Sequence, residues 1–393
     1  MSPPFLTFLA VSSLATVGII GQLVANSRFL SRHNAALAEW AQAAQDPAAS
    51  SAQAALQEGA LARTRLYEVL IKQTQLEDGM IVVRAKDGSA LDMCDSLLFS
   101  ALRYVALRKL GLDSDAEDAW AAISKSQHQG HWQRHPRCAH FTSRDMLFGV
   151  LAAFTQDPPE VRPLLVDTLR YIKENGGYLS HGPFHVSLVS PAAGEVLRTL
   201  ALGQGIPESL FPTPVSLGFS TIEFESLSPQ PGYVSHLVGL NIWIERELRR
   251  HKLYRAYASR PRTAVSNLSP LTAPFTPTSL HRNRAGWAAR QLHESAPENL
   301  FFKWLRLETA GALSPLTRAE MLRELMAMPQ FPSDRLPQDC DRQADYLWQR
   351  SQNRYTEKSE TCSKTFPGVD FLWMVALLTD PTADTPLPNR KIP

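Results

Sequence analysis

The sequence predicts an all-α protein built from paired helices, and three observations lead to this fold class. Six segments are apolar on nearly every side, as expected of helices that are buried among other helices. Between them lie amphipathic segments whose charged faces suit the outside of a protein. Strand-like alternation is scarce, and its exceptions are GMIVVRA at residues 79–85 and VSLGFSTIEFESL at residues 215–227.

The composition is that of a protein with a sizeable core. The chain has 393 residues, of which 44% are hydrophobic and 20% are charged. Its 40 basic residues nearly balance its 38 acidic residues. Nucleic-acid-binding proteins usually carry a basic excess or stripe, so we expect no nucleic-acid partner.

The amino terminus carries a hydrophobic stretch that predicts a helix. Phe5–Val24 contains no charged residue and is long enough to span a bilayer. Residues 1–33 are therefore expected to be a membrane anchor or a secretory signal peptide, although a buried helix is the alternative. The first cations, Arg28 and Arg32, follow the apolar run, so they leave the membrane orientation open.

The remaining chain divides into three parts. Residues 34–63 are rich in Ala and Gln and predict a helical or loose spacer. Residues 64–379 hold the predicted helical domain. Residues 380–393 are rich in Pro and Asp and predict an irregular tail.

The buried helices are expected where the apolar segments begin, at Asp95, Asp145, Ser190, Ser235, Pro297 and Asp370. DMLFGVLAAF and DFLWMVALL share the pattern Asp, any residue, Leu, aromatic, and DSLLFSALRYVAL repeats it with one extra residue. The initial acids and serines are the residue types that favour a helix amino terminus.

Amphipathic helices are expected to begin near Asp115, Pro159, Arg284 and Leu316. The buried segments recur at intervals of roughly 45 to 70 residues, which indicates a repeated helical hairpin.

Six buried helices that alternate with amphipathic ones resemble the six-hairpin (α/α) toroid, a fold used by many glycoside hydrolases and polysaccharide lyases. The resemblance covers residues 64–379 and rests on this architecture and on the Asp-x-Leu-aromatic repeat. It implies an (α/α)6 toroid whose inner helices run the same way, with their amino ends at one mouth. An open α-solenoid is the alternative, but solenoid loops are usually shorter than the long loops found here, at residues 127–144, 176–190, 211–234 and 330–367.

The toroid resemblance implies catalytic carboxylates at the mouth. Glycoside hydrolysis needs one carboxyl group as acid and another as base or nucleophile. Asp95 and Asp145 are the predicted pair, and Asp370 is the third candidate. Each aspartate has an alternative role, because the first turn of any helix stabilises a carboxylate. Arg144 would orient Asp145 and keep it ionised, or form a surface ion pair.

Binding of a sugar needs flat apolar surfaces and polar groups for hydroxyls. The predicted substrate-binding residues are Trp132, Arg134, His135, Arg144, His181, His236, Glu298, Asn299, Trp348 and Arg350. Trp348 would alternatively pack in the core, and His236 would alternatively be a hydrogen-bonded core histidine.

No metal or cofactor is expected. His131, His135, Cys138 and His140 are dense enough to be considered as zinc ligands, but their spacing fits no standard zinc pattern. The sequence has no glycine-rich phosphate loop, no GxSxG elbow and no CxxC motif. Cys94 precedes Asp95 directly, so the mouth geometry would allow a Cys94–Cys138 disulfide in an exported protein.

The sequence thus favours a carbohydrate-active enzyme that hydrolyses a glycosidic bond in a cell-envelope or surface glycan. We expect it to be periplasmic or membrane-anchored in a bacterial envelope, with a glycan as partner and contact with the membrane through its amino-terminal segment. Two alternatives remain open. One is a non-enzymatic, membrane-anchored toroid that binds glycan or protein. The other is a polysaccharide lyase that uses Tyr233, His236, Asn299 and Arg350.

Overall fold

The computed structural model describes Ser31 and residues 47–84, 89–92, 96–138, 142–181, 186–189, 191–211, 233–250, 277–297, 299–327 and 368–380. These residues are mostly helical, which confirms the predicted all-α class. Phe5–Val24, expected to form a hydrophobic helix, lies outside the described residues, as does the predicted tail beyond Asp380.

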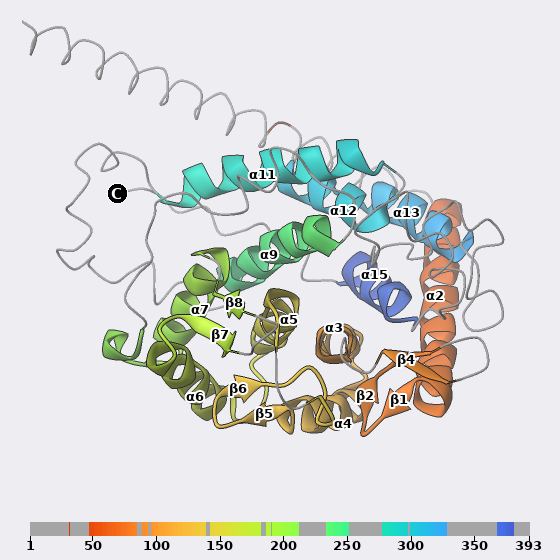
Figure 1. Cartoon of the computed structure of the whole chain (residues 1–393). Coiled ribbons are helices and arrows are strands. Elements are labelled where there is room, and N and C mark those ends of the chain that lie inside the picture. The colour runs from red at the N-terminus through yellow and green to blue at the C-terminus, as the bar shows by residue number, and fades with distance from the viewer. Residues whose placement is uncertain are drawn as a thin grey trace, which may run out of the picture.

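Helices begin close to each predicted apolar segment. They are α3 (Ser96–Lys109), α5 (Arg144–Phe154), α7 (Pro191–Gly203), α9 (Tyr233–Arg250), α12 (Leu300–Thr309) and α15 (Val369–Thr379). The other long helices are α2 (Pro47–Thr74), α4 (Asp113–Ser124), α6 (Val161–Glu174), α11 (Pro277–Ser295) and α13 (Pro315–Ala327). Figure 1 shows α2, α4, α6, α11 and α13 around the outside of α3, α5, α9 and α15.

Short antiparallel strand pairs stand in the connections that precede α3, α5 and α7. Their members are β1 (Leu76–Glu77) with β2 (Met80–Ile81), β3 (Val83–Arg84) with β4 (Ala90–Asp92), β5 (Gln127–His128) with β6 (His131–Trp132), and β7 (Tyr178–His181) with β8 (Val186–Leu188). A short 3-10 helix, Glu208–Leu210, follows α7. Strands β2 and β3 confirm the extended stretch predicted at residues 79–85, whereas residues 215–227 lie outside the described residues.

The helical domain begins earlier than the sequence predicted. Helix α2 runs without interruption through residues 63 and 64, where the spacer was expected to end. Ala60 and Arg63 are buried, and Arg63 donates a 2.8 Å hydrogen bond from Nη1 to the carbonyl oxygen of Met326. The alanine-rich composition predicted a helical or loose spacer here. It gave no sign that the second half of α2 packs on α13, because alanine suits exposed and buried helices equally.

Helices α3 and α5 run in the same direction. Gly149, in the middle of α5, lies against Leu98 near the start of α3, where a Cβ on the glycine would sit 2.9 Å from the Leu98 Cα. Further along both helices, the ring centroid of Trp120 lies 5.3 Å from that of Tyr104 and 6.1 Å from that of Phe154. Positions that advance together on two helices remain neighbours only when the helices are parallel.

The same reasoning applies to α9 and α12. His236 and Asn299 meet at the amino ends of the two helices, with 3.3 Å between the His236 Nε2 and Asn299 Nδ2 atoms. Arg246 and Glu308 form an ion pair close to their carboxyl ends. Helices α9 and α12 are therefore also parallel.

The carboxyl ends of α3, α9 and α15 meet at one residue. Lys109 ends α3, and its Nζ atom lies 2.7 Å from a carboxylate oxygen of Glu247 and 3.0 Å from one of Asp380. Glu247 belongs to the last turn of α9, and Asp380 directly follows α15. Because α15 also packs along α3, the amino ends of α3 and α15 lie together at the opposite end.

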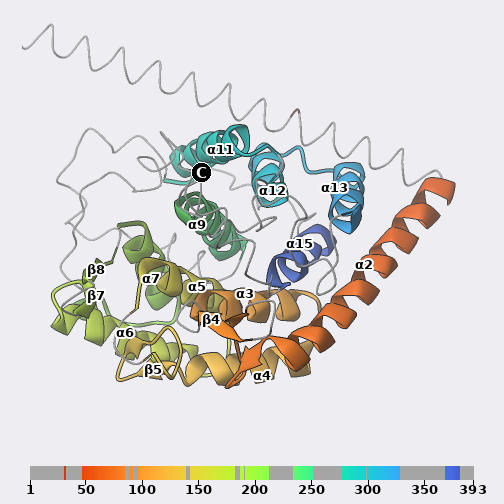
Figure 2. The same ribbon diagram turned by 45° about the vertical axis from the view of Figure 1, so that its right-hand side comes forward.

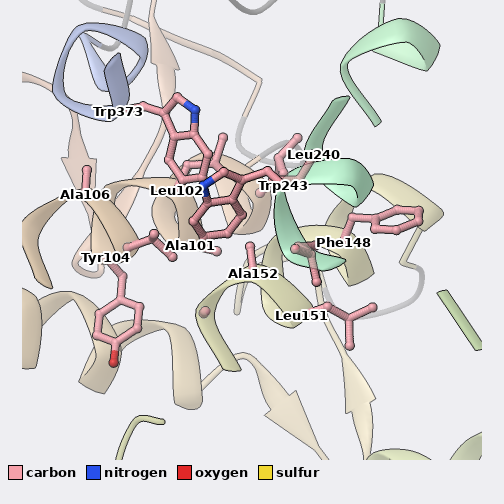
Figure 3. Packing of buried hydrophobic residues seen from close by; sticks show 14 of the residues in the cluster. Ala101, Leu102, Tyr104, Ala106, Phe148, Leu151, Ala152, Leu240, Trp243 and Trp373 are labelled. Carbon is pink, nitrogen blue, oxygen red and sulfur yellow. The ribbon is translucent and has the colours of Figure 1, made fainter. Parts of the chain in front are cut away.

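The centre of the molecule is apolar, and it joins the two ends of the described chain. Trp243 from α9 and Trp373 from α15 meet with ring centroids 4.6 Å apart, next to Leu102 of α3 (Figure 3). Helix α15 packs on α2 and α3, and α13 packs on α2. Figures 1 and 2 show the blue carboxyl-terminal helices beside the orange α2.

Candidate functional site

The amino ends of the inner helices lie away from the point where the carboxyl ends of α3, α9 and α15 meet, and we group these amino ends as the amino-end face. We define it by five residues in or just before the first turns of α3, α5, α9, α12 and α15: Ser96, Asp145, His236, Asn299 and Asp370. Ser96, His236 and Asn299 are buried, whereas Asp145 and Asp370 are partly exposed. Backbone N–H groups left unpaired at a helix start favour negative charge, so this face is suited to carboxylates and anions.

Asp145 is the second residue of α5 and accepts a hydrogen bond from the hydroxyl group of Ser143, the residue before the helix. Arg144, partly exposed, is the first residue of the same helix. Asp370 occupies the equivalent second position of α15, where its Oδ1 atom accepts a 3.1 Å hydrogen bond from the backbone N–H of Phe371. The third predicted carboxylate, Asp95, lies outside the described residues.

His236 and Asn299 form a buried polar pair. His236 is 0% exposed and Asn299 is 2% exposed, and the Asn299 amide donates to the imidazole Nε2 atom. Asn299 also caps α12, because its Oδ1 atom accepts a 3.2 Å hydrogen bond from the backbone N–H of Phe302. The His236 ring packs on the Phe302 ring at 5.1 Å. This pair fastens α9 to α12, and its burial corrects the substrate-binding role predicted for both residues.

Trp132 also differs from its prediction as a sugar platform. Its side chain is 3% exposed, and the indole Nε1 atom donates a 2.8 Å hydrogen bond to Thr168 on α6. The ring meets Phe154 edge-on at 5.9 Å. Both the polar and the apolar parts of Trp132 are therefore engaged in the core, so neither face of the ring is available to a sugar.

His135 is likewise a structural residue, which corrects its predicted role in binding. It is 0% exposed, and its Nδ1 atom accepts a 3.1 Å hydrogen bond from the backbone N–H of Arg137. Its Nε2 atom lies 3.3 Å from the Glu77 carbonyl oxygen, so this nitrogen carries the proton. With both ring nitrogens engaged, His135 ties its loop to β1.

Arg134 and Cys138 belong to the same loop. The Arg134 carbonyl oxygen accepts a 3.0 Å hydrogen bond from the backbone N–H of Leu97, which holds the loop against the first turn of α3. Arg134 is partly exposed. Cys138 is disulfide-bonded, and its pairing with Cys94 stays a prediction because Cys94 lies outside the described residues.

The other predicted site residues are not placed. Glu298, Trp348 and Arg350 lie outside the described residues, and of His181 only the backbone, at the end of β7, is described. Within the described part of the chain, no group of three or more His, Cys, Asp or Glu side chains is arranged to hold a metal ion. None of the described helices is long and apolar enough to cross a bilayer.

A buried charge cluster at the opposite end of the inner helices was missed by the sequence analysis. We call it the carboxyl-end cluster, and its members are Lys109, Arg246, Glu247, Arg250, Glu308, Arg318 and Asp380. Cations are stabilised where helix carboxyl ends converge, and the three acids of the cluster offset most of the charge of its four cations. The only sequence feature that pointed to this cluster was the run ERELRR at the end of α9. A charged run of this kind is typical of a solvent-exposed helix end, so it did not predict a buried cluster.

Within this cluster Arg246 has the central place. Its guanidinium pairs with Glu308, contacts Glu247 at 2.8 Å, and stacks over the Trp304 ring at 4.7 Å. Burial raises the pKa of Glu308, but the charges of Arg246 and Arg250 outweigh burial and hold that pKa below its ordinary value. The cluster is therefore a set of paired charges that links helix ends.

No protein-family model matches the chain, and no curated protein or solved structure shows significant similarity to it.

Proposed function

We propose that the helices form an (α/α)6 toroid and that the protein is a carbohydrate-active enzyme that hydrolyses a glycosidic bond. Three observations support this proposal: α3 runs parallel to α5, α9 runs parallel to α12, and the carboxyl ends of α3, α9 and α15 meet at Lys109. In a toroid this arrangement would bring Asp145 and Asp370, each the second residue of its helix, to the same mouth. Two carboxylates on one face are the groups that glycoside hydrolysis requires.

The surroundings of the two carboxylates suggest how the roles would be divided. Asp145 accepts a hydrogen bond from Ser143 and Asp370 accepts one from its own helix start, and such hydrogen bonds favour the charged form. We therefore assign Asp145 as the base that activates water and Asp370 as a charged group that supports it. Asp95 is the proposed acid that protonates the leaving oxygen.

The lyase alternative is opposed by burial. A lyase would need His236 or Tyr233 as a base that reaches the substrate, with Asn299 to neutralise a uronate. His236 and Asn299 are buried and bonded to each other, so they offer no free base to a polysaccharide.

One observation favours a second candidate, a non-enzymatic toroid that binds a glycan or a protein. The hydrogen bonds that Asp145 and Asp370 accept within their own first turns are those of acids that stabilise helix starts in any protein. In that case the amino-end face would bind a ligand without cleaving it. For both candidates we propose a bacterial envelope location, with Phe5–Val24 as anchor or export signal.

The experiment is a digestion of bacterial cell-wall and surface polysaccharides with the purified full-length protein, measured as new reducing ends. Asp95→Asn and Asp145→Asn are expected to lower the rate about 10²-fold or more, the usual contribution of a general acid or base. Circular dichroism reports whether each variant is folded. The matched control is Asp113→Asn, which changes an exposed acid in the first turn of the outer helix α4.

The outcomes separate the two candidates. Reducing ends from the native protein and the Asp113→Asn variant, but not from the folded Asp95→Asn and Asp145→Asn variants, support hydrolysis. Binding of a polysaccharide by all of these proteins without reducing ends supports the binding scaffold. Equal hydrolysis by the native protein and the Asp145→Asn variant would remove the role assigned to Asp145.

A further inference from the structure

The β5–β6 hairpin is a tight and well-defined turn. Gln127 pairs with Trp132 and His128 pairs with His131 in antiparallel register. The two residues between them, Gln129 and Gly130, have φ angles of 51° and 85°. Positive φ at both central positions is characteristic of the type I′ turn, whose twist matches that of the two strands.

Three contacts fix this hairpin on helix α6. Trp132 donates to the hydroxyl oxygen of Thr168, and Gln127 Nε2 donates a 2.8 Å hydrogen bond to the Leu164 carbonyl oxygen. Gly130 sits so close to the helix that a Cβ at this position would come within 2.1 Å of the Asp167 carbonyl oxygen. Both strands and the tip of the turn are therefore fixed against α6.

Register and alternation place two imidazoles side by side. Successive side chains of a strand point to opposite faces, so His128 and His131 share one face and Gln127 and Trp132 share the other. Directly paired residues of antiparallel strands have Cβ atoms roughly 4.5–5.5 Å apart. His128 is exposed, while His131 is partly buried against the ring of Tyr171, with 5.2 Å between centroids.

We propose that His128 and His131 together bind a divalent transition-metal ion, with water completing its coordination. Neutral imidazole is a common ligand for copper, nickel and zinc, and histidines at directly paired strand positions bring two such ligands close enough to share one ion. The site is independent of the proposed glycan hydrolysis, and it shares only His131 with the zinc ligands considered in the sequence. His135, by contrast, has both nitrogens engaged in its loop, and Cys138 is disulfide-bonded.

The environment of His131 agrees with this assignment. Burial, followed by the neighbouring charge of His128, lowers the pKa of His131 below its ordinary value. A lowered pKa favours the neutral ring, which is the form that binds a metal ion. The Tyr171 contact restricts the ring, so part of the entropy of ordering a ligand is already lost before the metal arrives.

The test adds Cu²⁺ alone to the full-length protein and measures stoichiometry by titration calorimetry and ligand type by electron paramagnetic resonance. The native protein is expected to bind one ion with the nitrogen hyperfine pattern of two imidazoles. His128→Asn and His131→Asn are each expected to lose that signal at a Cu²⁺ concentration that saturates the native protein. His128 is exposed, so its replacement leaves the core intact, and circular dichroism verifies this.

The control is His293→Asn, which removes a histidine of α11 far along the chain from the hairpin. It is expected to keep the native stoichiometry and the two-imidazole signal. The proposal is overturned if the native protein shows no two-nitrogen copper signal. It is equally overturned if the folded His128→Asn variant binds Cu²⁺ as the native protein does.

Discussion

Lys109 and Asp380 form an ion pair of 3.0 Å although 271 positions of the chain separate them. The pair joins the end of α3 to the residue that follows α15, and Glu247 at the end of α9 shares the same ammonium group. The carboxyl ends of three helices are thus tied together by one largely buried cation. The pair belongs to the carboxyl-end cluster.

Replacing Lys109 with Met is expected to lower the free energy of unfolding by about 3–5 kcal/mol, because it leaves the buried carboxylates of Glu247 and Asp380 without their shared partner. Urea denaturation followed by circular dichroism measures the change. The control is Lys303→Met, which breaks the more exposed pair with Glu324 and is expected to cost about 0–1 kcal/mol. Similar losses in both variants would contradict the role of the buried cation.

Asn299 is expected to contribute through two hydrogen bonds at the start of α12. Asn299→Ala removes the acceptor for the Phe302 N–H and the donor to His236, so the free energy of unfolding is expected to fall by about 1–3 kcal/mol. Asn299→Asp keeps a capping oxygen but has no amide to donate, so its loss should be smaller. Thermal denaturation of both variants tests this order, and equal stability of the alanine variant and the native protein would refute it.

Gly130 is expected to tolerate no side chain. Gly130→Ala introduces a Cβ that meets the Asp167 carbonyl oxygen, in addition to the cost of a positive φ. The matched control is Gly111→Ala, because Gly111 has a φ of 69° and nothing within 4 Å of an added Cβ. In the control, the free energy of unfolding should fall only by the cost of the left-handed conformation, about 1–2 kcal/mol. In Gly130→Ala it should fall by clearly more. Denaturant midpoints of the two variants compare these costs.

The pH dependence of stability should reflect Glu308. Its pKa in the folded protein lies below the ordinary value of 4.5, because the attraction of Arg246 and Arg250 outweighs burial. A depressed pKa contributes stability that is complete above the pKa of the unfolded chain and is lost as pH falls through the folded pKa. Glu308→Gln should therefore be less stable at neutral pH and should lose less stability between neutral pH and acid.

Denaturation of the native protein and the Glu308→Gln variant across this pH range measures the effect. The other charged groups of the carboxyl-end cluster remain in both proteins, so the difference between the curves isolates Glu308. Glu324→Gln, at an exposed ion pair, should leave the native profile unchanged. Parallel curves for the native protein and Glu308→Gln would show that Glu308 does not titrate as described.

The local sequence pattern was enough to locate the helices. It could not distinguish loop side chains that are buried in the core from loop side chains that are exposed and able to bind a ligand. The acids at residues 145 and 370 marked two helix starts to within one residue, because carboxylates and exposed N–H groups interact within a single turn. Trp132 and His135 were misassigned because the same residue types serve sugar binding and core packing. Only Thr168, 36 positions away, and Glu77, 58 positions away, show that both side chains are already satisfied.

The sequence by itself determined that the chain is helical, where the described inner helices begin, and that their first turns favour negative charge. These properties depend on periodicity and on contacts within one helical turn, so residues that are close in sequence determine them. The tertiary structure alone decided that α3 runs parallel to α5 and α9 to α12, that Lys109 meets Asp380, and that His128 and His131 share a face. Such relationships arise when distant segments bury a common apolar surface, and no local pattern specifies which segments will meet.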